Sequence, residues 1–249
     1  MNRRALIIYC NNTYSGALPG PEQDNKNYRR FLKSYLGGEW YEDEIKSLNN
    51  PTSILVEQMR QVFLNGADYT FIIFTGHGFI NSSDNNYQYI ELSDKNVSMR
   101  KLVTDAKRQT IIFDACRGLE TFESDEIIKS IKEDIKMFSA GRSTRAHFDK
   151  AVQAAEEGLT TLFAASVGQS AQDSKDGALY LLSLIRVSES WAEEEANIST
   201  VLPLHSAHKK AVKYMDENFI SLQEPIMGAE KRKNYFPFAI KLRRQIFFT

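Results

Sequence analysis

The sequence has few cysteines, no strong charge of either sign and no hydrophobic run long enough to cross a membrane. Its 249 residues include 2 cysteines, too few for the disulfide framework of a small secreted domain. The formal net charge of -1 provides no general attraction for nucleic acid or an anionic membrane surface. The first residues, MNRRALIIYC, have too short an apolar stretch and no small-residue cleavage site for a signal peptide. We therefore expect a cytoplasmic protein without nucleic-acid or membrane partners.

Apolar runs of strand length alternate with helix-like segments along the chain. Strands are expected at residues 5–10, 69–76, 110–114, 159–166 and 234–242. Helices are expected within 24–36, 51–66, 151–158, 177–187 and 204–219. Strands that are apolar on both faces and alternate with helices favour a mostly parallel sheet covered on both sides. Pro237 indicates that the last strand lies at or near an edge, because proline has no N–H group to donate.

Two of the expected strands are followed by residues that could take part in catalysis. In such sheets, ligands and catalytic groups gather beyond the carboxyl ends of the strands. His77 follows the strand at 69–76, and Cys116 follows the strand at 110–114. An isolated cysteine is about 3% thiolate at pH 7, so a neighbouring imidazole is needed to take its proton.

Each of the two residues also has an ordinary structural interpretation. A lone cysteine after a strand is usually a small buried hydrophobic residue, and a lone histidine in a loop can make a structural hydrogen bond. The joint occurrence of His77 and Cys116 at the ends of two core-type strands favours catalysis.

The segments IIFTGHG and IIFDACRG resemble the histidine and cysteine motifs of the caspase–metacaspase superfamily of cysteine peptidases. This chain has D-A-C-R-G where caspases have Q-A-C-[RQG]-G, and its histidine lies about 40 rather than roughly 50 residues upstream. Further similar segments are LSDKNVSMRKL, SVGQSAQDSKDGALY and LQEPIMGAEKRKNYFPFAI. The resemblance is closest to bacterial metacaspase-like domains.

The segment LPGPEQDNKNYRRFL is similar to the metacaspase loop and helix after the first strand. It keeps Leu18, Gly20 and Asp24 of the usual L-x-G-C-x-N-D pattern. Pro21 and Gln23 replace the cysteine and the asparagine. The resemblance covers nearly the whole chain apart from 119–147. It implies one peptidase domain over 1–249 with a variable linker or insertion at about 119–147. The implied fold is a three-layer α/β sandwich of about six mostly parallel strands.

The resemblance also implies the roles of the dyad. Cys116 attacks the scissile carbonyl and His77 protonates the leaving amine. The backbone N–H groups of Gly78 and Cys116 stabilise the oxyanion, and water then hydrolyses the acyl-enzyme. This chemistry requires no metal and no cofactor.

In metacaspases, the residues matching Asp24, Thr75 and Asp114 line the pocket for the residue before the cleaved bond. Two carboxylates in a partly dry pocket favour a cation. The resemblance therefore implies cleavage of a protein substrate after Arg or Lys, with Arg preferred because it pairs bidentately. The alternatives are that Asp24 only caps the following helix and that Asp114 forms a structural pair with Arg117.

Several other residues receive structural interpretations. Cys10 is expected to be a core thiol, and Arg117 to support the loop behind Cys116. His205 and His208 are three apart on an expected helix, but without a further ligand a solvated face is the better interpretation than a metal pair. Asp173 is interpreted as a turn residue, with membership of the acidic pocket as the alternative.

Residues 119–147 match the family poorly. Arg142 and Arg145 are hypothetical self-cleavage sites for a peptidase of basic specificity. The segment also has acidic residues that could bind calcium, an activator of many metacaspases, at Glu120, Glu123, Asp125 and Glu126. An acidic helix start explains them better, because they lack EF-hand spacing.

Two other classes of function stay open. The chain could be an idle caspase-like interaction module that waits for an activating partner, such as one in a bacterial defence or cell-death system. It could also be a small-molecule cysteine hydrolase on another α/β fold. Retention of both His77 and Cys116 favours an active peptidase.

Overall fold

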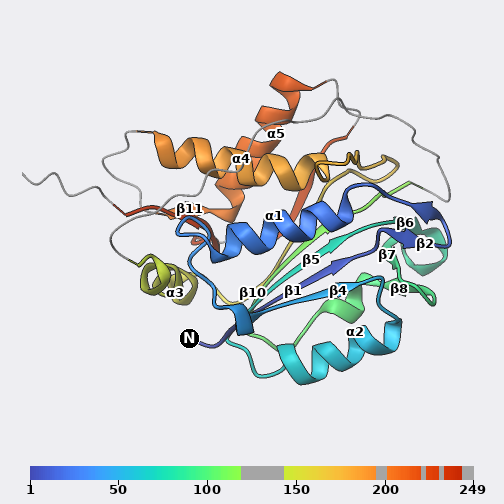
Figure 1. The fold of residues 1–249 in the computed structure, drawn as a ribbon, viewed down its shortest axis with the longest axis horizontal. Helices are drawn as coiled ribbons and strands as arrows, with labels where there is room; N and C mark the ends of the chain where they lie inside the picture. The colour runs from blue at the N-terminus through green and yellow to red at the C-terminus, as the bar shows by residue number, and fades with distance from the viewer. Residues whose placement is uncertain (119–142, 195–200, 220–222, 230–232, 243–249) are drawn as a thin grey trace, which may run out of the picture.

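The computed structural model describes residues 1–118, 143–194, 201–219, 223–229 and 233–242. At its centre lies a six-stranded sheet in the order β12-β10-β9-β5-β1-β4 (Figure 1). These strands are β1 (Arg3–Tyr9), β4 (Ile45–Asn49), β5 (Tyr69–Thr75), β9 (Arg108–Asp114), β10 (Gly158–Phe163) and β12 (Ile226–Ala229). All neighbouring strands are parallel except β10 and β12, which are antiparallel. The expected mostly parallel sheet of about six strands is confirmed.

Both edges of this sheet differ from the sequence prediction. The edge strands β4 and β12 were not expected, because each is short and only partly buried. The expected late strand is β13 (Pro237–Ile240), which pairs with β11 (Val201–Pro203) in a separate antiparallel ribbon. All four residues of β13 are buried, so its apolar pattern resembled that of a strand in the central sheet.

Helices cover both faces of the sheet and complete the expected three layers (Figure 1). One face packs against α1 (Pro21–Lys33), α3 (Arg145–Ala154), α4 (Leu179–Glu193) and α5 (Leu204–Asn218). The other face packs against α2 (Ser53–Met59), the π-helical turn η2 (Arg60–Leu64) and the 3-10 turn η4 (Met99–Leu102). Alternate residues of the strands enter the two cores, since successive side chains of a strand point to opposite faces.

Smaller elements lie at the carboxyl edge of the sheet and in the loops that connect the main strands and helices. They are β2 (Asn12–Thr13), β3 (Gly16–Ala17), η1 (Glu42–Glu44), β6 (Gly78–Asn81), η3 (Ser82–Asp84), β7 (Tyr87–Glu91) and β8 (Asn96–Ser98). β6, β7 and β8 form a three-stranded antiparallel sheet. This sheet follows β5 directly in the chain, so it lies beside the strand end that carries His77.

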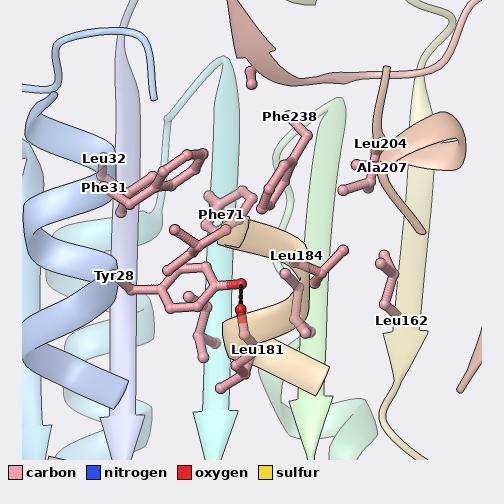
Figure 2. Packing of buried hydrophobic residues seen from close by; sticks show 14 of the residues in the cluster. Tyr28, Phe31, Leu32, Phe71, Leu162, Leu181, Leu184, Leu204, Ala207 and Phe238 are labelled. Carbon is pink, nitrogen blue, oxygen red and sulfur yellow. Dashed lines mark hydrogen bonds between the residues drawn. The ribbon is translucent and has the colours of Figure 1, made fainter. Parts of the chain in front are cut away.

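Helix α1 illustrates how the sequence produces local structure. Pro21 occupies its first turn, where proline has no N–H bond to lose. Its buried face carries Tyr28, Phe31 and Leu32 at helical spacing. Figure 2 shows these side chains packed beside residues of α4, with the Tyr28 hydroxyl donating to the Leu181 carbonyl over 3.3 Å. Helices α1 and α4 are thereby held together above the sheet.

Several helix boundaries differ from the prediction, and the two largest differences are at the start of α3 and the end of α4. Helix α3 begins at Arg145 rather than at 151, so the expected variable segment 119–147 ends inside a helix. Helix α4 continues to Glu193 rather than ending near 187. Residues 119–142, which include Arg142 and the acids considered for calcium, lie outside the described residues. Among the described residues, no helix has both the length and the apolar character that crossing a bilayer requires.

Candidate active site

The strand register places His77 and Cys116 at the same edge of the sheet. β5 and β9 are parallel neighbours, and Thr75 is in register with Asp114. The ladder continues one residue further, because the Gly76 N–H donates to the Asp114 carbonyl over 3.2 Å. His77 and Cys116 each lie two residues beyond the last paired position. The two residues therefore follow the carboxyl ends of adjacent strands at equivalent positions in the register.

The thiol of Cys116 is held in its protonated form. Its side chain is half-buried, and Sγ lies 3.9 Å from the Ala171 carbonyl oxygen. Burial raises the pKa of the Cys116 thiol, and the charges of Asp114 and Asp173 raise it further. Reaction as a nucleophile therefore requires a base. The Nε2 atom of His77 is buried without a hydrogen-bond partner among the described residues, so no other contact there competes for it.

Three carboxyl groups gather beside Cys116, and we call Asp24, Asp114 and Asp173 the acidic cluster. Asp24 accepts hydrogen bonds from the Thr75 hydroxyl at 2.7 Å and from the Ala178 N–H at 2.9 Å. Asp173 accepts from the Gly20 N–H at 3.0 Å. Asp114 has one oxygen, Oδ2, that is buried without a partner among the described residues. The cluster thus combines residues from α1, β9 and the loop after β10.

The acidic cluster has a deficit of positive charge. Burial raises the pKa of Asp24 to about 7, and the charge of Asp173 adds to this shift. Burial raises the pKa of Asp114 well above its ordinary value, with contributions from Asp24 and Asp173. Burial likewise raises the pKa of Asp173 to about 6. No lysine or arginine of the described residues contributes to these three shifts. A cation bound here would relieve both repulsion and desolvation.

Backbone N–H groups at the N-terminus of α4 hydrogen-bond to two members of the acidic cluster. Ala178, which precedes the helix, donates its N–H to Asp24, and the Leu181 N–H hydrogen-bonds to Asp114. Helix N-termini stabilise nearby negative charge. Gly177 allows the approach, because its φ is +123° and a Cβ there would collide with the Asp24 carboxylate. The carboxylates are consequently fixed by backbone groups rather than by cationic side chains.

The structure contradicts the two structural alternatives for Asp24 and Asp114. The N-cap of α1 is Gly20, whereas Asp24 lies within the first turn and bonds to other elements. Arg117 turns away from Asp114 and donates to the Gln88 side chain at 3.1 Å and the Ala165 carbonyl at 3.3 Å. Its guanidinium lies 4.2 Å from the centre of the Phe163 ring. The expected role of Arg117 in supporting the cysteine loop is confirmed.

Asp173 is more than a turn residue. Its charge is coupled to both other acids and to the thiol. The sequence favoured the turn because the AQDSKDG segment has turn composition. The contact with Gly20 spans 153 residues of chain, so only the folded chain brings Asp173 to the cluster.

The remaining candidates lie away from this centre or serve structural roles. Cys10 is fully buried, and burial raises its pKa to about 12, which confirms the expected core thiol. The expected solvated face at His205 and His208 is wrong. His208 is half-buried where α5 packs on α4, and its Nδ1 shares a 2.7 Å hydrogen bond with the Tyr180 hydroxyl. His205 stacks on Tyr235.

Gly78, the residue expected to supply an oxyanion N–H, begins β6 directly after His77. A Cβ at Gly78 would collide with Ala115, the neighbour of Cys116. The turns after β5 and β9 therefore approach each other closely. A Cβ at Gly78 would also collide with the side chain of Gln88 in β7. The sequence did not indicate Gln88, because a glutamine in a strand without a continuous apolar run has no distinctive pattern.

Comparison with known proteins adds one finding. A family model described as the caspase domain matches residues 2–236. No match was found among the curated proteins. The matched range includes both strand ends and all three residues of the acidic cluster.

Proposed function

Because the chain belongs to the caspase-domain peptidase family, we propose that it is a cysteine endopeptidase that cleaves protein substrates after a basic residue. The observation that carries this proposal is the acidic cluster beside Cys116, which has no cation of its own among the described residues. We propose further that residues 1–249 act as one domain and that arginine is preferred over lysine.

The chemistry assigned to the dyad follows from its position. His77 takes the proton of Cys116 as the sulfur attacks the scissile carbonyl carbon. The N–H groups of Gly78 and Cys116 stabilise the negative oxygen of the tetrahedral intermediate. His77 then protonates the leaving amine, which gives an acyl-enzyme. Water deprotonated by His77 hydrolyses this thioester and restores the free thiol.

The selectivity assigned to the acidic cluster follows from charge. A guanidinium among Asp24, Asp114 and Asp173 can make paired hydrogen bonds with carboxylate oxygens, which an ammonium cannot. The Thr75 hydroxyl holds one oxygen of Asp24 and thereby orients the carboxylate. An aspartate side chain at this position would add a further carboxylate to a cluster that already disfavours negative charge, and would be excluded.

Matched fluorogenic peptides that end in Arg, Lys or Asp test the proposal. We expect kcat/KM to be highest for the Arg peptide and lower for the Lys peptide. The Asp peptide should not be turned over. Cys116→Ala should abolish turnover. Asp114→Asn should lower kcat/KM for the Arg peptide by about 100-fold, because the buried guanidinium of the substrate loses a charged partner. Asp176→Asn, on the loop of Asp173, is the matched control. Turnover of the Asp peptide alone would overturn the assignment.

Labelling separates an active enzyme from an idle interaction module. An arginine chloromethylketone should alkylate Cys116 in the wild-type protein and leave His77→Ala unlabelled. An unlabelled wild-type protein would favour the module that waits for an activating partner. Labelling without cleavage of any peptide would favour a small-molecule cysteine hydrolase.

Self-cleavage is a further part of the proposal, and the fold limits where it can occur. Arg145 begins α3, and its guanidinium is paired with Glu44 at 2.5 Å and lies over the Tyr41 ring. A peptidase binds its substrate in an extended form, so Arg145 is a poor site while α3 is folded. Mass spectrometry of wild-type and Cys116→Ala protein should show no fragment ending at Arg145. Such a fragment from the wild-type protein alone would show that α3 unwinds.

A further inference from the structure

The hairpin of β6 and β7 connects the turn that carries His77 to the turn that carries Cys116. On one side, the Glu91 N–H donates to the His77 carbonyl over 3.0 Å. On the other side, the Ile80 N–H donates to the Gly118 carbonyl over 3.2 Å. The hairpin is thus hydrogen-bonded to the backbone of His77 and to that of Gly118, two residues after Cys116.

Gln88 is the side chain at the centre of this connection. It is buried, with an exposed fraction of 2%. Its amide nitrogen donates to the Cys116 carbonyl at 3.2 Å and to the Tyr89 carbonyl at 2.9 Å. Its amide oxygen accepts from Nε of Arg117 at 3.1 Å. Both N–H groups and the oxygen are therefore used, which leaves the amide one satisfied orientation.

The peptide group between Cys116 and Arg117 is held from two directions. Its carbonyl accepts from Gln88, and its N–H donates to the Gln169 carbonyl over 2.9 Å. Arg117 is itself fixed by the Ala165 carbonyl and the Phe163 ring. Backbone rotation at the nucleophile would break at least one of these contacts. The position of Sγ relative to the histidine turn thereby depends on Gln88.

We infer that Gln88 is a positioning residue for the dyad, which it serves by tying the Cys116 peptide to the hairpin that begins at the histidine turn. The inference rests on the proposed cysteine chemistry. Gln88 touches no reacting atom, so its effect operates through Cys116 and Arg117. Small displacements of reacting groups can cost about 100-fold in rate, whereas substrate binding at the acidic cluster does not involve this amide.

Gln88→Met tests the inference, because methionine keeps the length of the side chain and removes its polar contacts. The matched control is Gln109→Met. Gln109 is also 2% exposed, and its side chain donates to the Leu102 carbonyl and accepts from the Thr104 N–H. It lies on β9 at the end remote from Cys116. Both variants lose buried hydrogen bonds, so both should have a similarly lowered melting temperature.

Only Gln88→Met should lower kcat, by about 10- to 100-fold with KM changed less than about twofold. It should also shift the pH profile of Cys116 alkylation by iodoacetamide to higher pH, because the thiol loses its aligned base. Peptide mapping assigns the label to Cys116 rather than to the buried Cys10. Gln88→Glu, which keeps the acceptor for Arg117 but has no donor for the Cys116 carbonyl, should show the same changes.

Equal kcat values and equal alkylation profiles for the Gln88 and Gln109 variants would overturn the inference. Alkylation needs no peptide turnover. A wild-type protein that cleaves no basic peptide would refute the proposed specificity, while the alkylation profiles would still decide the role of Gln88. If Gln88→Met does not fold, the comparison of Gln88→Glu with Gln109→Glu decides it by the same readouts.

Discussion

Asp173 is the residue whose charge acts both on the other two acids of the acidic cluster and on the Cys116 thiol. Together with burial, it raises the pKa of Asp24 and Asp114, and after burial and Asp114 it raises the pKa of Cys116. Burial and the charges of Asp114 and Asp173 therefore favour the protonated form of the thiol. A guanidinium among the carboxyls would cancel this charge and favour the thiolate. In the enzyme proposed above, recognition of a basic residue and activation of the sulfur would thus be electrostatically linked.

Asp173→Asn should consequently make the Cys116 thiol more reactive and at the same time weaken the binding of an Arg peptide. Without the negative charge the pKa of Cys116 falls, so its alkylation by iodoacetamide at pH 7 should become about two- to tenfold faster. The KM for an Arg peptide should rise, because one attractive carboxylate is lost. Asp176→Asn, on the same loop, should change neither measurement. Slower alkylation of Asp173→Asn would contradict the electrostatic link.

At the scale of elements, α3 is attached to the molecule through its first turn. Glu39 accepts from the Ser143 hydroxyl at 2.6 Å, the Thr144 N–H at 2.6 Å and the Arg145 N–H at 3.2 Å. It thereby satisfies helix N–H groups that have no partner within the helix. Behind it, Arg3 pairs with Asp149 of α3 at 3.1 Å. The first turn of α3 is consequently anchored to Glu39, in the segment between α1 and β4.

Glu39→Ala should remove this cap. The free energy of unfolding, measured by urea titration, should fall by about 1–2 kcal/mol, as for other lost helix caps. Glu42→Ala is the control, because within the described part of the chain its carboxylate pairs only with Lys33 and Arg29, at the surface. Exposed pairs contribute at most about 1 kcal/mol. A smaller loss for Glu39→Ala than for Glu42→Ala would refute the capping role.

For the whole molecule, the buried acids make stability depend on pH. The folded protein raises the pKa of Asp24 to about 7 and that of Asp173 to about 6, both above their values in the unfolded chain. The folded state therefore binds these protons more tightly. Stability from this source is fully present below about pH 4, the unfolded pKa, and is lost as the pH rises from there to about 7.

The wild-type protein should accordingly lose unfolding free energy between pH 6 and pH 7.5, and Asp24→Asn should lose less of it. We expect a difference on the order of 1–2 kcal/mol between the two proteins. His208 acts in the opposite sense at lower pH, since burial lowers its pKa to about 4, but its effect is common to both proteins and cancels. Parallel pH profiles would show that Asp24 is ionised throughout.

The sequence by itself determined the features that depend on local pattern. Continuous apolar runs predicted β1, β5, β9 and β10, because strands buried on both faces need no polar alternation. The rule that strand ends of a parallel sheet share one edge then predicted that His77 and Cys116 follow the carboxyl ends of strands at one edge, and the structure shows that these strands are neighbours. The family motifs added Asp24, Thr75 and Asp114, of which the structure joins Asp24 to Thr75 by a hydrogen bond.

Only the tertiary structure decided the features that depend on contacts between distant segments. The edge strands β4 and β12 have little apolar pattern, so their pairing is set by the strands beside them. Asp173 meets Gly20 across 153 residues, and Gln88 meets Cys116 across 28. A polar residue that is buried through such contacts has the same local sequence as an exposed one. Its environment arises only when the chain folds, because burial and hydrogen-bond partners belong to the assembled molecule.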